Sequence, residues 1–315
     1  MSEVVELKNN AVDAVSIVMQ IKKLIQAGDI KNTDLVKEAD MSPTTVSQIL
    51  SDKYAADPKE QIKKLSQWLK HYKKKKASPV TNPGFIQTLT AKHIMDDMTY
   101  AQISESIVVI FGASGVGKSE ALREYKRNNN NVWYVTASPS RSSLTECLYE
   151  LAMELDMEEA PRRKGPLSRV IRKRLMNTEG LIVIDEADHL DYPTLEELRI
   201  LQEETGVGMV LAGNNRVYTQ LTGGRRNEDF ARLFSRIAKK RGIHKTKIAD
   251  VRAIADGWNV FGEKERSLMQ QISDSPGGLR VLTKTLKLAA MFCTGELINQ
   301  KALRAAFKEL TTDQE

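Results

Sequence analysis

The chain has little cysteine, no long apolar run and no arginine before Arg123. Its two cysteines, Cys147 and Cys293, lie far apart in helical-looking apolar patterns, without a His or Cys neighbour at metal-ligand spacing. We therefore expect buried free thiols, which suit a reducing cytoplasm. No apolar run approaches the roughly 18 residues of a membrane-spanning helix, and the segment Met1–Lys8 carries acids rather than a basic cluster. Neither a membrane span nor a signal peptide is expected.

Length and composition are those of a soluble protein with more than one domain. A chain of 315 residues exceeds the roughly 100 to 200 residues of an ordinary domain, which predicts two or three modules. Hydrophobic residues make up 41% and charged residues 28%, as is typical of globular proteins. The net charge of +6 fits a polyanionic partner, but such an excess is also common on solvated surfaces. Charge alone does not identify the partner.

Two changes along the sequence divide the chain. Arginine is absent before Arg123, whereas Lys and Arg are mixed after it. The segment Tyr72–Gly84 combines a lysine run with two prolines and a glycine, and a helix cannot continue through it, so we expect a linker. The predicted organisation is an N-terminal domain at 1–76, a linker at 77–90, a core at 91–246 and a C-terminal domain at 247–315.

In the core, short apolar runs alternate with helical patterns, which predicts a parallel sheet covered by helices. Four buried strands are expected, at Ile107–Phe111, Val132–Ala137, Leu181–Asp185 and Met209–Gly213. A polar fifth strand at Arg241–Thr246 would suit a sheet edge. Only helical periodicity follows, near Ile248–Trp258, Glu263–Ser273, Leu279–Phe292 and Gln300–Leu310. We call this last part the lid. The predicted fold class is α/β, with a five-stranded parallel sheet and a helical lid.

A glycine-rich segment between the first strand and the next helix matches the phosphate-binding pattern G-x-x-x-x-G-K-[ST]. It consists of Gly112, Ala113, Ser114, Gly115, Val116, Gly117, Lys118 and Ser119. The glycines let backbone N–H groups converge on phosphate oxygens, and the helix start presents unpaired donors to the same anion. Lys118 would contact the β and γ phosphates of ATP, and the Ser119 hydroxyl would hold Mg²⁺. A simple connecting turn would not need both of these side chains.

Two adjacent carboxylates, Asp185 and Glu186, end the third strand, at the edge where open parallel sheets bind their ligands. Asp185 would coordinate Mg²⁺, usually through water, and Glu186 is suited to orient or deprotonate the attacking water. An acidic strand end is often only a helix cap, but two carboxylates after four apolar residues favour catalysis. The letters DEAD also occur in a helicase family, yet the remaining residues contain no second P-loop-like domain.

The order of these elements resembles that of the AAA+ ATPases. Within that resemblance, Asn214 corresponds to the first sensor, which would lie between the acidic groups and the γ-phosphate, and Arg280 to the second sensor. Arg236 resembles the arginine finger that such proteins insert into a neighbour's site, with Arg232 as the second candidate. Each residue alone is weak support, because Asn in turns and Arg on helices are usually structural or solvated. The order of these residues along the chain matches that of the family and strengthens each assignment.

Longer stretches resemble the B transposition proteins of Mu-like phages. They read NNNNVWYVT, APRRKGPLSR, GLIVIDEADHL, EELRILQE and FARLFSRIAKK. The resemblance implies a protein that polymerises on DNA with ATP, delivers target DNA to a transposase and stimulates strand transfer. It also implies an ATPase stimulated by DNA and by transposase, working in the bacterial cytoplasm. Asn215 departs from the His expected at that position and leaves Asn214 in place.

Segment Asp34–Leu50 predicts a helix, a tight turn and a second helix, similar to the helix-turn-helix of small phage repressors. Ser42 would cap the second helix, Pro43 would open it, and Asp40 tolerates the left-handed turn. Contacts with double-stranded DNA would come from Thr44, Thr45 and Gln48. A helical protein-docking module remains the alternative.

A second candidate for DNA contact is the basic segment Pro161–Arg174, in which Leu167, Val170 and Ile171 mark one helix face. Its basic residues are Arg162, Arg163 and Lys164 on a preceding loop, and Arg169, Arg172 and Lys173 on the helix. In ring or filament AAA+ assemblies this region can approach the central axis, which favours a sequence-nonspecific DNA track. A solvated basic face is the alternative.

The sequence leaves two rival functions open. One is a loader of a replicative helicase, which would share the ATPase core and DNA binding but act with another partner. The other is a transcriptional regulator in which ATP switches the helix-turn-helix module. Footprinting at a promoter would favour the regulator, and sequence-tolerant coating of DNA would favour transposition.

Overall fold

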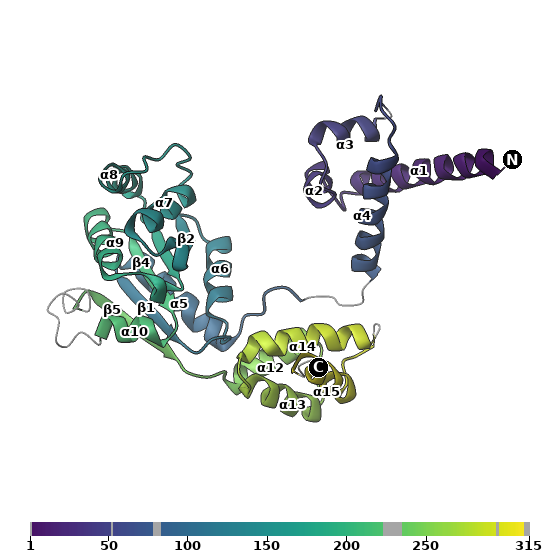
Figure 1. The fold of residues 1–315 in the computed structure, drawn as a ribbon. Coiled ribbons are helices and arrows are strands. Elements are labelled where there is room, and N and C mark those ends of the chain that lie inside the picture. Colours follow the sequence, from purple (N-terminus) through teal and green to yellow (C-terminus); the bar gives the residue numbers. More distant parts are fainter. Residues whose placement is uncertain (1, 52, 78–82, 223–234, 294–295, 312–315) are drawn as a thin grey trace. The chain divides into compact units, whose positions relative to one another are not determined.

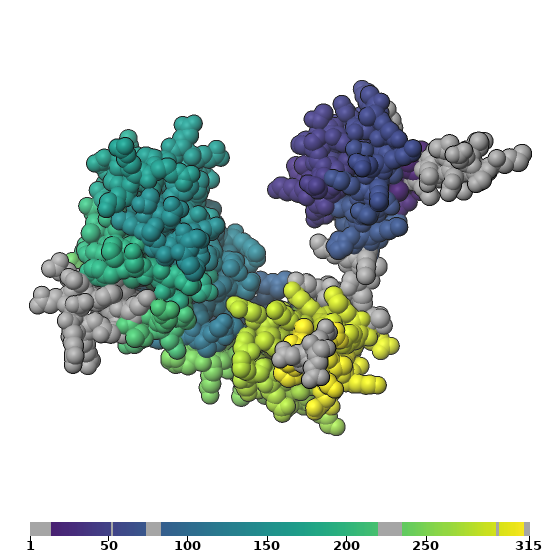
Figure 2. Space-filling view, viewed as in Figure 1, coloured from purple at the N-terminus to yellow at the C-terminus, as the bar shows by residue number. Residues whose placement is uncertain are grey.

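The computed structural model describes residues 2–51, 53–77, 83–222, 235–293 and 296–311. The chain forms two compact units, Met1–Thr81 and Asn82–Glu315, and the boundary between them lies inside the predicted linker. Each unit has its own hydrophobic core, and Figure 2 shows the closely packed surface atoms of each unit. Among the described helices, none has both the length and the hydrophobicity needed to span a membrane.

The N-terminal unit is built from helices. They are α1 (Ser2–Gln26), α2 (Asn32–Glu38), α3 (Pro43–Leu50) and α4 (Lys59–Ala77). Ile21, Leu35, Val46 and Leu65 are among the buried side chains that form its core. Helix α4 continues through the lysine run and ends at Ala77, inside the segment Tyr72–Gly84. Lysine has a good helix propensity, and the first proline after the lysine run is Pro79.

Helices α2 and α3 form the predicted helix-turn-helix. Asp40 has a φ of 49°, the left-handed conformation that the sharp turn requires and that Asp tolerates. Ser42 caps α3, since its hydroxyl accepts a hydrogen bond from the Thr45 N–H at 3.1 Å, and Pro43 occupies the first helical position. Local chemistry therefore accounts for both helix ends of the motif.

The second unit contains a five-stranded parallel sheet (Figure 1). Its strands are β1 (Ile107–Gly112), β2 (Val132–Thr136), β3 (Leu181–Asp185), β4 (Gly208–Gly213) and β5 (Ile237–Ile243), in the order β2-β3-β4-β1-β5. This confirms the predicted fold class and the edge position of the fifth strand. That strand begins four residues before Arg241 and ends three residues before Thr246, because the residues that pair with β1 are Ile237–Ile243, with a register shift after Ile237.

Helices cover both faces of the sheet, because successive side chains of each buried strand point to opposite faces. Ile107 and Val109 of β1 pack against α7 (Leu144–Glu154), α8 (Lys164–Leu175) and α9 (Tyr192–Thr205). Val108 and Ile110 pack against α5 (Leu89–Ile103) and α6 (Lys118–Asn128) on the other face. A short helix, α10 (Asn215–Thr222), follows β4. The resulting core holds the carboxyl ends of the strands rigidly.

The lid consists of α12 (Ile248–Gly257), α13 (Glu263–Asp274), α14 (Gly278–Phe292) and α15 (Gln300–Thr311), close to the predicted ranges. Buried Asp250 on α12 joins the lid to the first turn of α5. The Thr90 N–H donates to its Oδ1 at 2.9 Å, and the Thr90 hydroxyl donates to its Oδ2 at 2.6 Å. Both cysteines are buried and unpaired, as predicted, and burial raises the pKa of Cys147 to about 12.

Candidate functional site

The loop after β1 needs glycine at three positions for steric reasons. Gly112, Gly115 and Gly117 have φ values of 142°, 79° and 93°, which side-chain-bearing residues rarely adopt. A Cβ on Gly115 would lie 1.9 Å from the carbonyl oxygen of Gly277, which precedes lid helix α14. The Leu279 N–H also donates to the Gly115 carbonyl at 2.9 Å. The loop is therefore packed directly against the start of a lid helix.

Lys118 is the first residue of α6, and its ammonium group is turned onto the loop. It donates to the carbonyl oxygens of Gly112 at 3.0 Å and Ala113 at 2.8 Å. Burial of the ammonium group lowers the pKa of Lys118, and the carboxylates of Asp185 and Glu186 oppose part of that shift. The two carbonyl oxygens stabilise the ammonium charge of Lys118, and these contacts can be exchanged for stronger contacts with phosphate oxygens.

Asp185 lies at the end of β3, is 2% exposed and has hydrogen bonds to both carboxylate oxygens. The Tyr134 hydroxyl donates to Oδ2 at 2.6 Å, and the Glu186 N–H donates to Oδ1 at 3.0 Å. Burial and the neighbouring carboxylate raise the pKa of Tyr134, which keeps its hydroxyl a donor. Glu186 has a φ of 55°, so the chain turns sharply where the second carboxylate is presented.

Asn214 follows β4, and Asp188 holds its side chain. The Asn214 side-chain amide donates to Asp188 Oδ2 at 2.6 Å, and its backbone N–H donates to Oδ1 at 3.2 Å. Asn214 also lines the cavity that Asp185 and Glu186 line, and its place between these acidic groups and a γ-phosphate stays a prediction. Sequence reasoning missed both Tyr134 and Asp188 as parts of the site. Asp188 belonged to the DEAD letters, but nothing in the sequence distinguished it from a helix cap.

These groups surround one cavity of about 860 Å³. The loop residues Ser114, Gly115, Gly117, Lys118 and Ser119 line it together with Asp185, Glu186, Asn214 and Arg280. Further cations line it from α6 and α14, namely Arg123, Arg127, Lys284 and Lys287. The structure therefore brings the predicted loop, the two carboxylates, Asn214 and Arg280 to one place. Gly112, Ala113 and Val116 belong to that loop without lining the cavity, and Arg236 does not line it. The excess of positive charge suits a polyphosphate.

Another part of the cavity wall is apolar. Phe85 and Ile86, which precede α5, line the cavity together with Ile254 and Trp258 of the lid. A Cβ on Gly257 would lie 2.6 Å from the Ile86 side chain, so this segment packs tightly on α12. A cavity with a polar, cationic part and an apolar part can hold the phosphates and the base of a nucleotide.

Arg236 lies immediately before β5 and therefore at the other end of the sheet from the glycine-rich loop. The parallel register places Ile237 beside Ile107 at the start of β1, and Ile243 beside Gly112 at its end. A strand of this length spans about 20 Å, so Arg236 cannot reach the cavity of its own chain. Its guanidinium pairs with Glu203 at 2.7 Å and is 60% exposed. Arg232 lies outside the described residues.

The predicted basic face lies on α8, whose Leu167 and Ile171 are buried against the sheet core, with Val170 partly buried beside them. Lys164 is the first residue of this helix, whereas it was expected on the preceding loop. The side chains of Arg163, Lys164, Arg169 and Lys173 are exposed. Two predicted contacts have partners within the chain: Arg162 stacks on Tyr149 at 3.5 Å, and Arg172 pairs with Glu204 at 2.5 Å.

In the N-terminal unit, Thr44 and Gln48 are exposed on α3. Thr45 is only half-exposed, and its hydroxyl shares a 2.8 Å hydrogen bond with the capping Ser42 hydroxyl. Two of the three predicted contact residues therefore present their side chains to solvent, and the third supports the helix start.

Two family models match the chain. A model described as an AAA domain matches residues 102–221, and a model described as the C-terminal part of the Mu B transposition protein matches residues 235–310. The chain is 50% identical over 295 residues to the ATP-dependent target DNA activator B of Escherichia phage Mu, covering 93% of this chain and 94% of that protein. It is 43% identical over 272 residues to the Mu-like prophage FluMu DNA transposition protein B of Haemophilus influenzae, covering 86% and 95%.

Among solved structures, the fold is similar to that of a Walker-type ATPase of Pyrococcus abyssi. The TM-score is 0.50 at 11% sequence identity, and the similarity covers 72% of each chain. At this identity the likeness concerns the fold alone.

Proposed function

The chain belongs to the family of the phage Mu target DNA activator B, and from this membership we propose that it is an ATP-dependent, DNA-binding AAA+ ATPase that assembles on target DNA and delivers it to a DNA transposase. One observation carries the proposal. The phosphate loop, the strand-end carboxylates, Asn214 and Arg280 line a single cavity between the core and the lid.

The nucleotide would bind with its phosphates at the glycine-rich loop and its base toward Phe85, Ile86 and Trp258. Lys118 would exchange its two loop carbonyls for the β and γ phosphates. Mg²⁺ prefers hard oxygen ligands, and the Ser119 hydroxyl and the Asp185 carboxylate fit it. When bound there, the ion would neutralise charge on the phosphates. The carboxylate of Asp185 is already oriented from both sides by hydrogen bonds.

Hydrolysis needs an oriented water and a stabilised γ-phosphate. Glu186 is proposed to orient or deprotonate the attacking water, and Asn214, fixed by Asp188, to bind near the γ-phosphate. Arg280 would contact the phosphates from the lid. Arg236 would act in the cavity of a neighbouring chain, since it lies too far from its own. In related hydrolases such an arginine contributes on the order of 10³ to 10⁵ in rate, so assembly rather than nucleotide binding would set turnover.

Double-stranded DNA is the proposed partner of the basic face of α8, through Arg163, Lys164, Arg169 and Lys173. These exposed cations suit phosphate contacts without base readout. Arg162 stacks on Tyr149 and keeps its positive charge, whereas Glu204 offsets the charge of Arg172. Helix α3 offers a second DNA contact through Thr44 and Gln48, with Thr45 supporting the helix start.

The proposed activity includes self-association into an ATP-dependent filament or ring, and ATPase stimulation by DNA and by transposase. The place of action is the bacterial cytoplasm, where the target DNA lies. The family models that match give no support to the rival functions of helicase loader and transcriptional regulator, because one of those models describes a transposition protein.

In vitro strand transfer with the cognate transposase tests the proposal. The intact protein is expected to stimulate transfer, Lys118→Ala to abolish stimulation by preventing nucleotide binding, and Glu186→Gln to bind ATP and DNA without turnover. If the folded intact protein binds ATP and DNA but leaves strand transfer unstimulated, the transposition function is wrong and the ATPase assignment survives. If the protein takes up no ATP with Mg²⁺, the whole proposal fails.

A further inference from the structure

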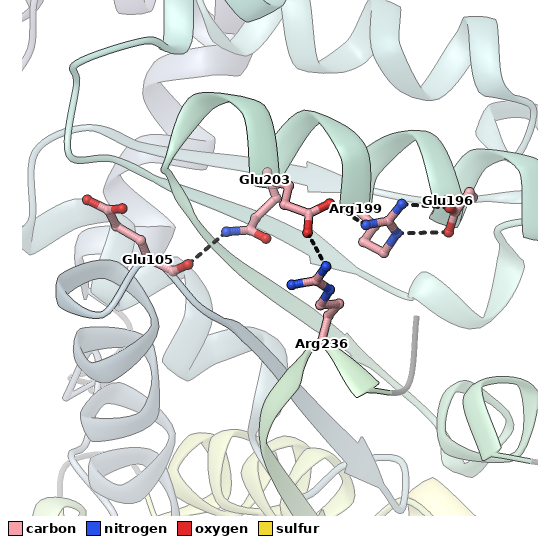
Figure 3. Close-up of polar contacts among 6 residues, drawn as sticks. Glu105, Glu196, Arg199, Glu203 and Arg236 are labelled. Atoms are coloured by element: carbon pink, nitrogen blue, oxygen red, sulfur yellow. Dashed lines mark hydrogen bonds and ion pairs between the residues drawn. The ribbon is translucent and has the colours of Figure 1, made fainter. Parts of the chain in front are cut away.

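A row of alternating charges runs from α9 to the residue before β5 (Figure 3). Arg199 donates to both carboxylate oxygens of Glu196, at 3.0 and 2.7 Å, and to Glu203 Oε2 at 2.5 Å. The other oxygen of Glu203, Oε1, accepts from Arg236 Nη2 at 2.7 Å. Glu203 therefore uses one oxygen for each of two arginines and connects Arg236 to the helix.

Exposure increases along this row. The side chain of Arg199 is 12% exposed, that of Glu203 is 40% exposed and that of Arg236 is 60% exposed. Arg199, the buried member of the row, is held by hydrogen bonds to two carboxylates. Glu203 is therefore held by a side chain that is itself fixed in place. The pKa of Arg199 is raised, first by its hydrogen bonds with Glu196, and its guanidinium stays charged. The row thus extends from a rigid helix to an exposed guanidinium.

We infer that Glu203 is a positioning residue for Arg236, holding its guanidinium in the orientation that a neighbouring chain's nucleotide requires. The inference rests on the proposed assembly, in which Arg236 acts in the cavity of another copy. The described ion pair uses one guanidinium nitrogen, whereas an arginine offers five N–H donors in a fixed fork. Phosphate oxygens can therefore be bound while the contact with Glu203 persists.

The contact positions the arginine rather than sequestering it. A pair this exposed is weak, so it restricts the rotamers of a long side chain without preventing contact with a phosphate. Loss of the pair should slow trans-activated hydrolysis about three- to fivefold, the upper part of the range that corresponds to an exposed ion pair. That is far smaller than the roughly 10³-fold or greater loss expected for removal of the arginine itself.

Mixed assemblies separate the two roles. Arg236→Ala chains keep an intact cavity but lack the arginine, and serve as acceptors. Glu186→Gln chains bind nucleotide without hydrolysing it and serve as arginine donors. Acceptors and an excess of donors are mixed at saturating duplex DNA, and ATP turnover is measured against ATP concentration. Co-assembly is followed independently by energy transfer between donor and acceptor labels.

The donor then carries a second change. Glu203→Gln removes the carboxylate charge that faces Arg236. Glu204→Gln is the matched control, because Glu204 is the next residue of the same helix, is 44% exposed and pairs with Arg172 instead. We expect maximal turnover to fall three- to fivefold with the Glu203→Gln donor and to stay unchanged with the Glu204→Gln donor. The half-saturating ATP concentration and the extent of co-assembly should not change in either case, whereas a general loss of structure would alter both.

Each outcome decides a separate question. Equal or greater turnover with the Glu203→Gln donor overturns the positioning role and leaves the trans arginine intact. Absence of turnover with the unaltered donor, although the labels report co-assembly, overturns the trans action of Arg236 and with it this inference. A fall in turnover with both the Glu203→Gln and Glu204→Gln donors assigns the effect to α9 as a whole and also overturns the positioning role of Glu203.

Discussion

The substitution Tyr134→Phe leaves the ring and removes one hydroxyl that supports Asp185, a residue of the cavity wall. That hydroxyl donates to Asp185 Oδ2 at 2.6 Å, and Asp185 is 2% exposed, so solvent cannot readily replace the donor. The remaining hydrogen bond, from the Glu186 N–H to Oδ1, holds only one side of the carboxylate. The change therefore tests whether Tyr134 orients the proposed magnesium ligand.

The structure sets the size of the expected effect. A hydrogen bond to a charged acceptor contributes about 1.5 to 3 kcal/mol, and at a buried carboxylate water can replace little of that energy. Since 1.36 kcal/mol corresponds to a factor of ten, full transfer of this energy to ion binding predicts Mg²⁺ affinity roughly tenfold to a hundredfold weaker. Substitutions of residues that orient metal ligands have effects of that size. Binding of ATP without Mg²⁺ should change less than about twofold, since Tyr134 does not line the cavity.

The assay is a Mg²⁺ titration of the folded protein with a fluorescent ATP analogue, which reads binding rather than turnover. Tyr125→Phe is the matched control. It removes the same hydroxyl group from a tyrosine outside the cavity, where that hydroxyl donates to Gln102 at 3.0 Å. Thermal unfolding of both variants checks the fold. A Tyr134→Phe midpoint within twofold of the wild-type midpoint, with the fold intact, would refute the reasoning.

Three further predictions follow from other parts of the molecule. Asp97→Asn should cost about 2 to 3 kcal/mol of unfolding free energy at neutral pH in chemical denaturation, because a fully buried carboxylate loses its charged contacts with two basic residues of β5. Although burial alone would raise the pKa of Asp97, those contacts hold that pKa below its ordinary value. The stabilisation therefore exists above about pH 4 and disappears as the pH falls further. If the Asp97→Asn variant lost stability in acid as steeply as the wild type, this explanation would be contradicted. Gly115→Ala should weaken ATP binding at least about tenfold in a titration, because its Cβ would lie 1.9 Å from a lid carbonyl oxygen; unchanged affinity would exclude the tight packing of loop and lid. Replacing Arg163 and Lys164 with Ala should weaken binding to duplex DNA and reduce the slope of log affinity against log salt by about two; an unchanged slope would show that these two exposed side chains are only solvated.

Several features could be predicted because their causes are local. The glycines of the loop, the order of Lys118 and Ser119, and the carboxylates that end an apolar strand each follow from a short stretch of chain. The lid helices followed from spacing alone, and their observed ends differ from the expected ones by at most one residue. Ser42 and Pro43 marked the start of α3 for the same reason, since helix capping depends on adjacent residues.

Contacts between distant residues were not predictable in this way. Tyr134 contacts Asp185 because β2 pairs with β3 in the register that places Thr136 beside Asp185, and no short-range pattern encodes that register. The partnership of Asp188 with Asn214 depends likewise on how the turn after β3 packs against the end of β4.

The sequence by itself determined the α/β fold class, the phosphate loop and the two acidic groups, because periodicity and glycine chemistry act over a few residues. The tertiary structure alone decided which charges are already paired. It placed Arg162 on Tyr149 and Arg172 on Glu204, and it set Arg236 at the end of the sheet opposite the cavity of its own chain. Packing brings together residues that are remote in the chain, and the energy of a charge depends on what packing puts beside it.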